Sequence, residues 1–309
     1  MAPTSHVHHL ASRAIPFDYA AHRPFGRVAR AVGPLAHAAA ALARRVRVEG
    51  ATALGRLGHQ WNALGERDAL GAVLTRPGFA PAWDLHDFFE TGRADVDRLM
   101  TRAAWRVPEL SRDRALDFGC GVGRLTQALA LYFSEVCGVD VAHSMIAFAR
   151  RENRAPQRCH FEVNRRAHLR RFQTGTFDLV YSRLVLQHIP PHLVTRYIPE
   201  LVRVLAPGGL LVFQLPTVIS DPVRSFYDAP VRGRLKRALP SCVVRGYRTL
   251  KYPLFRPPVS EMDMFGLARE TVVRLVDQAG GQIVATLPDG SHGTSQPGFE
   301  YWVTRTSVA

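Results

Sequence analysis

The sequence has few of the residues that would indicate a disulfide scaffold, a metal centre or a membrane span. Its 309 residues include four cysteines, with no C-x-x-C pair and no histidines at a zinc-ligand spacing. No apolar run approaches the roughly 18 residues that a membrane-spanning helix needs. Hydrophobic residues make up 47% and charged residues 21%, which is typical of a globular protein and excludes a disordered chain. The cysteine usage favours a reducing compartment, so we expect a cytoplasmic protein.

Lysine is also scarce, although the chain is strongly basic. Among its 40 lysine and arginine residues only Lys236 and Lys251 are lysines, and the formal net charge is +14. Such a charge is compatible with a nucleic-acid or membrane-surface partner. A simpler explanation is that a GC-rich coding sequence has enriched arginine together with alanine, glycine and proline. Net charge therefore does not assign a partner by itself.

Residues 1–80 differ from the rest and are expected to form a separate extension. Up to Val48 the only acidic residue is Asp18, against seven arginines. Three interpretations remain open for this region: an organelle transit peptide, a basic amphipathic helix over residues 25–48 that contacts a membrane surface, or a loosely packed, helical or partly disordered extension. We favour the last. Order is expected to begin near Trp83, with one domain over residues 81–309.

Short apolar runs alternate with helical patterns over the core of this domain, residues 115–215, as in parallel βαβ units. A helix with one apolar face is predicted just before them, within residues 94–107. Pro199 lies inside the last helical pattern and is expected to kink or restart that helix, and the pair Gly208-Gly209 is expected to end it. Strands are predicted at Ala115–Phe118, Val136–Val141, His160–Val163, Phe177–Ser182 and Leu210–Gln214.

Residues 216–260 interrupt this alternation and are interpreted as an insertion. They contain prolines, basic residues and aromatic residues, which could bind an anionic or lipid-like substrate, stack bases or form a solvated surface. A closing helix and two strands are predicted over residues 261–306, with the strands paired around the loop 288–298. The basic cluster of the insertion comprises Arg232, Arg234, Lys236, Arg237, Arg245, Arg248, Lys251 and Arg256.

The most informative segment is the glycine loop Gly119–Gly123, which joins the first predicted strand to a helix. Glycine allows a backbone to turn sharply and to approach a ligand closely, and the helix that follows directs free N–H groups at that ligand. About twenty residues on, Asp140 ends the second strand, where a carboxylate can bind both hydroxyls of an adenosine ribose. The sequence therefore predicts a cofactor that contains adenosine.

The charge at this loop distinguishes between such cofactors. The spacing is G-x-G-x-G rather than the G-x-G-x-x-G of dinucleotide-binding enzymes, and Asp117 lies two residues before the first glycine. A carboxylate at this place repels a pyrophosphate and attracts a cation, through a charge-assisted hydrogen bond or through water. These residues favour a positively charged adenosine cofactor over NAD or ATP.

Four segments of residues 115–215 together resemble class I S-adenosylmethionine-dependent methyltransferases. They are LDFGCGVGRLT, which resembles the first motif, VCGVDVAHSMIAFAR, which resembles the ribose-binding motif, FDLVYSRLVLQHIP, which resembles the fourth strand and active-site loop, and LVRVLAPGGLLVFQLP, which resembles the next helix and strand. The resemblance implies an α/β, Rossmann-like fold: a seven-stranded, mostly parallel sheet with an antiparallel last strand, flanked by helices. It also implies S-adenosyl-L-methionine as the cofactor.

The resemblance further implies which residues contact the cofactor. Asn164 stands where the family often has an acidic residue, and its amide oxygen can accept the same hydrogen bond from the adenine amino group. The implied contacts are Asp117, Gly119, Cys120, Gly121 and Gly123 at the methionine end, Asp140 at the ribose, Val141, Met145 and Asn164 at the adenine, and Ser182 and Arg183 near the transferable methyl group.

Methyl transfer is a displacement at a carbon that its sulfonium leaving group already activates, so proximity and orientation can supply much of the catalysis. His188 is the candidate general base for an acceptor that must lose a proton; alternatively it only shapes the pocket. His188 and His192 flank two prolines, so they form no H-E-x-x-H metal site, and no metal is expected.

We therefore predict an enzyme that methylates an oxygen, nitrogen or carbon atom of a small molecule. The alternatives are an RNA methyltransferase that uses the basic surface and a non-catalytic protein that binds S-adenosylmethionine. An NAD-dependent oxidoreductase is a more distant alternative. No pattern in the sequence indicates an oligomeric state.

Overall fold

The computed structural model describes residues 34–74, 82–217, 264–290 and 297–306, with side chains from Ala53 onward. By its contacts the chain divides into Met1–Arg44, of which only a helical backbone from Pro34 is described, and Arg45–Ala309. The basic cluster predicted within residues 216–260 lies outside the described residues, and so do the side chains of residues 25–48. The following description concerns the second unit.

Seven strands form one sheet in the order β3-β2-β1-β4-β5-β7-β6. All neighbouring strands from β3 to β5 are parallel, and β7 runs antiparallel to both β5 and β6. This confirms the predicted seven-stranded, mostly parallel sheet with an antiparallel last strand. The strands are β1 (Arg114–Phe118), β2 (Glu135–Asp140), β3 (Cys159–Val163), β4 (Phe177–Ser182), β5 (Leu205–Pro216), β6 (Gly281–Asp289) and β7 (Gly298–Arg305).

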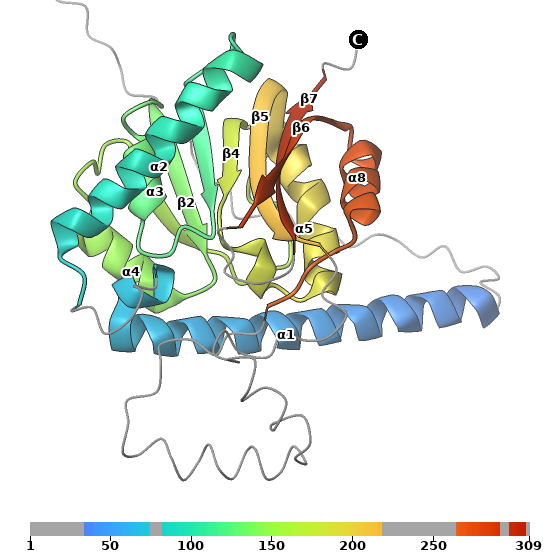
Figure 1. Cartoon of the computed structure of the whole chain (residues 1–309). Coiled ribbons are helices and arrows are strands. Elements are labelled where there is room, and N and C mark those ends of the chain that lie inside the picture. The colour runs from blue at the N-terminus through green and yellow to red at the C-terminus, as the bar shows by residue number, and fades with distance from the viewer. Residues whose placement is uncertain (1–33, 75–81, 218–263, 291–296, 307–309) are drawn as a thin grey trace, which may run out of the picture. The chain divides into compact units, whose positions relative to one another are not determined.

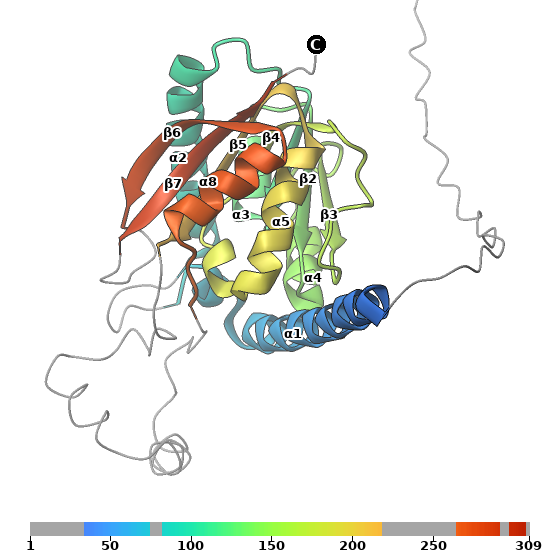
Figure 2. The same ribbon diagram turned by 90° about the vertical axis from the view of Figure 1, so that its right-hand side faces the viewer.

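Helices cover both faces of the sheet (Figures 1 and 2). On one face α2, α3 and α4 pack against strand residues such as Ala115 and Leu179, and on the other α5, α8 and part of α1 pack against residues such as Leu116 and Val180. Successive strand residues therefore point to opposite layers, so the central strands are almost continuously apolar. The helices are α1 (Pro34–Val73), α2 (Leu85–Arg106), α3 (Arg124–Leu129), α4 (His143–Arg151), η1 (Leu186–His188, a 3-10 turn), α5 (Pro191–Val204) and α8 (Arg269–Gln278).

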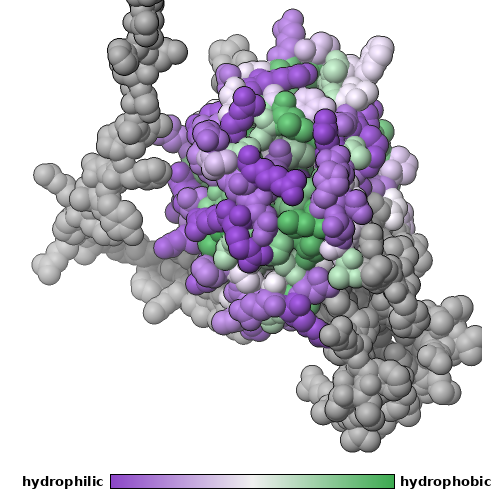
Figure 3. All heavy atoms as spheres, turned by 90° about the vertical axis from the view of Figure 1, so that its left-hand side faces the viewer, coloured by the Kyte–Doolittle hydropathy of each residue, from purple (hydrophilic) through white to green (hydrophobic). Residues whose placement is uncertain are grey.

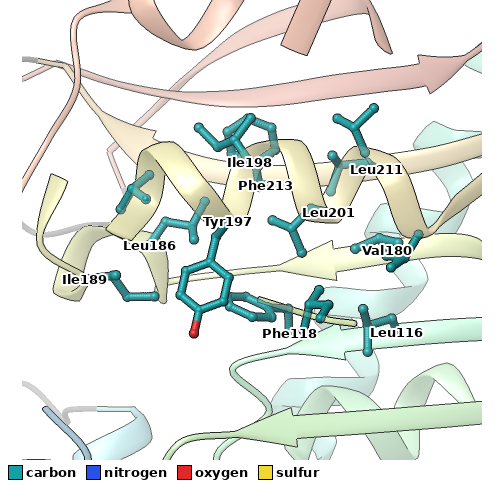
Figure 4. Packing of buried hydrophobic residues seen from close by; sticks show 14 of the residues in the cluster. Leu116, Phe118, Val180, Leu186, Ile189, Tyr197, Ile198, Leu201, Leu211 and Phe213 are labelled. Atoms are coloured by element: carbon teal, nitrogen blue, oxygen red, sulfur yellow. The ribbon is translucent and has the colours of Figure 1, made fainter. Parts of the chain in front are cut away.

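Helix α5 shows how the apolar pattern produces this packing. Its buried residues Tyr197, Ile198 and Leu201 recur at helical spacing and contact the sheet residues Leu116 and Phe213, among others (Figure 4). Burial of each such side chain stabilises the fold by about 1.5–3 kcal/mol.

By contrast, hydrophilic residues predominate on the face of the molecule shown in Figure 3, and the hydrophobic residues there form smaller areas between them.

The boundary between α5 and β5 differs from the sequence prediction. Helix α5 runs through Pro199 as a single element and ends at Val204, and Gly208 lies within β5 rather than at the helix end. Gly208 has a φ of +75°, and the pairing of β4 with β5 shifts its register just before Leu210. The glycine pair thus forms an irregularity in the strand, where a positive φ is needed. Packing on both sides of Pro199 outweighs the lost helix hydrogen bond.

The prediction that order begins near Trp83 is wrong for the second half of α1. Ala53, Leu54 and Leu57 are buried against α5 and the sheet, and Ala69 and Ala72 are buried beside α4. These alanines and leucines recur at helical spacing within an arginine-rich sequence, and that spacing is the signal the sequence analysis missed. The fold therefore includes a helix that precedes the βαβ core.

Candidate active site

A cavity opens at the carboxyl ends of the parallel strands, where α/β sheets bind ligands. It encloses about 920 Å³ of empty space, including its opening to solvent. Its walls come from the glycine loop after β1, the ends of β2 and β3, the segment after β4, and α1. Gly119, Cys120, Gly121, Asp140, Val141, Met145, Asn164 and His188, all predicted from the sequence, line this cavity. The structure thus brings together residues that lie up to 69 positions apart in the chain.

The glycine loop is built so tightly that side chains do not fit. Gly119 and Gly123 have φ angles of +81° and +82°. A Cβ atom at Gly119 would lie 2.3 Å from the Val185 side chain, and one at Gly123 would lie 2.7 Å from the ring of Phe161. Both clashes add to the backbone strain, so these positions require glycine for two independent reasons. The loop consequently leaves its backbone accessible at the floor of the cavity.

Asp140 ties the end of β2 to this loop. One of its carboxylate oxygens accepts a hydrogen bond from the backbone N–H of Gly121 at 3.0 Å, and the other accepts one from the N–H of Ala142 at 2.8 Å. Desolvation raises the pKa of Asp140, while these two hydrogen bonds oppose that rise by favouring the charged form. The carboxylate is therefore fixed in place at the cavity wall, as a ribose-binding group requires.

Asp117 lies behind the glycine loop and not at the cavity surface. Its side chain is buried and accepts a hydrogen bond from the Thr126 hydroxyl on α3 at 2.7 Å. Burial raises the pKa of Asp117 to about 6, although the hydrogen bond from Thr126 and the positive charge of Arg124 oppose that rise. Gly123 and Ser182, also predicted as contacts, do not line the cavity either, and the buried Ser182 Oγ has no hydrogen-bond partner among the described residues. These three residues support the site from behind.

At the other end of the cavity, Asn164 uses its amide to shape the loop that follows β3. Its Oδ1 accepts a hydrogen bond from the Arg166 N–H at 3.2 Å, and its Nδ2 donates to the His168 carbonyl at 3.4 Å. Val141 and Met145 line the cavity beside it. The predicted adenine contacts thus share one region, with the Asn164 oxygen already accepting one hydrogen bond.

The segment after β4 is held in a strained conformation by a buried glutamine. Leu184 has a φ of +60°, unusual for a residue other than glycine, and lines the cavity. Its N–H donates to the Oε1 of Gln214 at 3.1 Å, and the Nε2 of Gln214 donates to the Oε1 of Gln187 at 3.4 Å. Strain of this kind persists only where the surroundings determine the conformation, and it is typical of ligand-binding sites. The sequence analysis did not identify this network.

His188 follows directly and lines the cavity. Its Nε2 lies 3.2 Å from the Nε2 of Gln187, and its ring packs edge-to-face against Trp61 with 5.5 Å between centroids. An amide nitrogen can only donate, so the Nε2 lone pair of His188 accepts from it. This contact positions the imidazole and engages one of the two atoms that could act as a base.

Two arginines also line the cavity: Arg124 at the start of α3 and Arg183 directly after β4. Arg124 is buried and donates to the Asp95 carboxylate at 2.8 Å and to the Thr91 hydroxyl at 3.1 Å. The Nε of Arg183 lies 3.8 Å from the same carboxylate. Arg183 was predicted to lie near the methyl group, whereas Arg124 was not predicted. Without α2 beside it, an arginine after a glycine loop is indistinguishable from a surface residue.

The last wall of the cavity is apolar and comes from α1. Leu54, Leu57 and Trp61 line it from one segment of the helix, and Val73 lines it from the end. Asp68 interrupts the helical geometry between them and its Oδ1 accepts from the Gly71 N–H at 2.9 Å, as an N-cap residue does. An apolar wall here excludes water from the part of the cavity that it covers.

Neither a metal cluster nor a membrane span is found in the part of the chain that the structure describes. Its histidines, cysteines and acidic residues form no group of three or more that could hold a metal ion. None of its helices is long and apolar enough to cross a bilayer.

Comparison with known proteins identifies the family. Residues 116–213 match a family model described as a methyltransferase domain. A trans-aconitate 2-methyltransferase from Methylobacterium radiotolerans is 31% identical over 201 residues, which cover 60% of this chain and 70% of that enzyme. A trans-aconitate 2-methyltransferase from Variovorax paradoxus is 36% identical over 151 residues, 48% of this chain; the match thus spans little more than half (56%) of that enzyme.

A solved structure shares the fold. The magnesium protoporphyrin IX methyltransferase of Synechocystis PCC 6803, with bound SAH, superimposes with a TM-score of 0.52 at 16% identity, covering 82% of this chain and 99% of that one. The glycine loop, the fixed carboxylate at the end of β2 and the sequence relatives agree with the resemblance found in the motifs. The chain belongs to the class I S-adenosylmethionine-dependent methyltransferases.

Proposed function

We propose that this chain transfers a methyl group from S-adenosylmethionine to an oxygen, nitrogen or carbon atom of a small molecule. The observation that carries the proposal is a single cavity in which the glycine loop and Asp140 face the segment after β4. The first two form a nucleoside site, and the third lies beside it at the neighbouring strand end. A cofactor and an acceptor can therefore meet in one enclosed space.

The residues present fit this cofactor. Asp140 would hold the ribose hydroxyls, Val141 and Met145 would pack on the adenine, and Gly119 and Gly121 would let the amino-acid end approach the backbone. When bound, the cofactor supplies a methyl group on a positively charged sulfur. Asp117 lies behind the loop and, when ionised, stabilises that charge from a distance.

The acceptor is proposed to be small and anionic. The two sequence relatives described above are trans-aconitate 2-methyltransferases, so trans-aconitate is the first acceptor to test. The arginines Arg124 and Arg183 in the cavity wall are consistent with an anion. A lipid-like acceptor, membrane contact through residues 25–48 and a cytoplasmic location remain predictions from the sequence.

Calorimetry with S-adenosylhomocysteine, the product form of the cofactor, tests the site directly. We expect wild type to bind and Asp140→Ala to bind at least tenfold more weakly, because it removes the fixed ribose acceptor. Asp87→Ala, an exposed carboxylate on α2, is the matched control and should bind like wild type. Absence of binding in wild type would overturn the proposal.

The reaction is then tested with isotopically labelled cofactor. Incubation with trans-aconitate, and separately with a metabolite extract, should give a labelled small molecule that mass spectrometry identifies. Label that appears only in added RNA would instead support the RNA methyltransferase alternative.

A further inference from the structure

Arg124 and Arg183 meet at one carboxylate, although they come from different ends of the βαβ core. Arg124 begins α3, Arg183 follows β4, and Asp95 reaches them from α2. The Asp95 side chain is 13% exposed, that of Arg124 4% and that of Arg183 22%. Two guanidinium groups thus share one carboxylate in a largely buried place at the cavity wall.

The acidic residues that interact with these arginines, Asp95, Asp117 and Asp289, do not line the cavity. Asp95 also forms an ion pair with Arg98, one turn along α2, whose side chain is 65% exposed. The one acidic residue among those described as lining the cavity is Asp140, and its two oxygens accept backbone hydrogen bonds at the end of β2. Among the described residues, the part of the cavity wall formed by Arg124 and Arg183 therefore contains no carboxylate of its own.

A hydrogen-bond donor in the cluster is also unused. The Nε of Arg124 is buried and has no acceptor among the described residues. Buried donors are almost always paired, and a donor on a charged group is especially unfavourable without a partner. An anion in the cavity would lie beside two guanidinium groups, of which that of Arg183 is the more accessible.

We propose that Arg124 and Arg183 form a carboxylate-binding site inside the cavity, with Asp95 as the residue that positions them. Guanidinium groups bind carboxylates through two parallel hydrogen bonds, which a cavity wall with two of them can exploit. The strand order β3-β2-β1-β4 places this site on the opposite side of the glycine loop from Asp140 and Asn164. It therefore lies away from the predicted adenosine end.

Two ligands of the proposed reaction carry such a group: the amino-acid end of the cofactor and an acidic acceptor. The inference rests on the proposed function for the identity of these ligands, but its chemistry is the same for both. Arg183 is the more exposed of the two arginines and can be changed with less risk to folding than Arg124.

The test compares Arg183→Gln with Arg98→Gln, which removes another arginine paired with Asp95 but no residue that lines the cavity. Calorimetry measures the dissociation constants of S-adenosylhomocysteine, of methylthioadenosine, which lacks the amino-acid end, and of trans-aconitate added to the S-adenosylhomocysteine complex. Arg183→Gln should weaken a carboxylate ligand about 10- to 100-fold and leave methylthioadenosine unchanged. Arg98→Gln should bind all three like wild type.

The pattern of losses identifies the ligand. Weaker S-adenosylhomocysteine alone assigns the site to the cofactor, and weaker trans-aconitate alone assigns it to the acceptor. Asp95→Asn should weaken the same carboxylate ligand several-fold, because the arginines lose the carboxylate that positions them, and should leave methylthioadenosine unchanged, which a general loss of structure would not. Thermal unfolding of each variant checks that the fold is retained.

Equal affinity of Arg183→Gln and wild type for both carboxylate ligands would overturn the inference. The proposed function would survive that result, because wild-type binding of S-adenosylhomocysteine and Asp140→Ala test it separately. Conversely, wild type that binds trans-aconitate but no adenosine ligand would overturn the proposed function and leave the carboxylate site standing.

Discussion

Asn62 on α1 caps α4 through Ser144. The Ser144 N–H donates to the Asn62 Oδ1 and the Ser144 hydroxyl donates to the Asn62 backbone carbonyl, each at 3.0 Å. Ala142, the N-cap residue of α4, has no side chain that could cap the helix, so Asn62 satisfies one of the free N–H groups of the first turn from another element. The contact fixes α1 beside the adenosine end of the cavity.

Replacing Asn62 with alanine should therefore lower both stability and cofactor affinity. The lost cap is expected to reduce the free energy of unfolding by about 1 kcal/mol, and a looser α1 should weaken S-adenosylhomocysteine several-fold. Urea unfolding and calorimetry measure the two effects. His59→Ala, an exposed change on the same helix, serves as the control. Unchanged affinity in Asn62→Ala would show that this contact does not shape the cavity.

Asp117 should reduce stability at neutral pH and increase cofactor affinity. Its folded-state pKa of about 6 lies above the ordinary value of 3.8, so ionisation opposes folding. The penalty is fully present above pH 6 and disappears as the pH falls towards 4. Asp117→Asn should then be more stable than wild type by ~1–3 kcal/mol at pH 8, with the difference vanishing near pH 4.

Asp117→Asn also allows the effect of this carboxylate on stability to be measured separately from its effect on cofactor binding. A protonated Asp117 no longer attracts a cationic cofactor, so S-adenosylmethionine should bind wild type more weakly below pH 6 and Asp117→Asn more weakly at pH 8. Denaturant unfolding and calorimetry between pH 4 and 8 follow both quantities, with Asp113→Asn, an exposed carboxylate before β1, as the control. A variant that is less stable than wild type at pH 8 would contradict this account.

Gly123 and Gly208 allow backbone strain to be separated from steric clash. Both have a positive φ, but a Cβ at Gly123 meets the Phe161 ring at 2.7 Å, whereas nothing lies within 4 Å of one at Gly208. Gly208→Ala should cost about 1 kcal/mol of stability from strain alone. Gly123→Ala should cost about 1–3 kcal/mol more from overpacking and should weaken cofactor binding. Equal losses of stability would argue against tight packing at the loop.

His188 should position the acceptor rather than remove a proton from it, if the acceptor is a carboxylate. A carboxylate is already ionised at neutral pH, so we expect His188→Asn to lower kcat less than about tenfold, against the 10²- to 10⁴-fold loss typical of a missing general base. His192→Asn, an exposed neighbour, is the control. If the wild-type profile of kcat against pH has an acidic limb that is absent in His188→Asn, the assignment of His188 as the base would be restored.

The parts of the fold that follow from local periodicity could be predicted from the sequence. Phe177–Ser182 is a strand with the predicted bounds, and β2 ends at Asp140, one residue before the predicted end at Val141. The incorrect predictions concern features of secondary structure that tertiary packing determines. Helix α5 continues through Pro199 because neighbouring residues before and after it, such as Ile198 and Leu201, are buried. Gly208 forms a strand irregularity that the alternation of residue types does not encode.

The residues that line the cavity were predictable around the glycine loop and the end of β2, and much less so after β4. Gly119 and Asp140 belong to a short motif whose spacing carries chemical meaning. Arg124, Asp95 and Leu184 acquire their roles only when α2, α3 and the end of β4 come together. The spacing of residues along the chain cannot predict that these three residues come together, since they lie on separate elements.

The apolar wall that α1 adds to the cavity comes from outside the segment 116–213 that matches the methyltransferase model. The residues proposed to bind the nucleoside and the surface formed by Leu54, Leu57 and Trp61 thus lie in separate stretches of the chain. Substitutions at these three residues should therefore change which acceptors fit the cavity without altering the residues of the glycine loop or Asp140. Directed evolution of new methylation products should begin there.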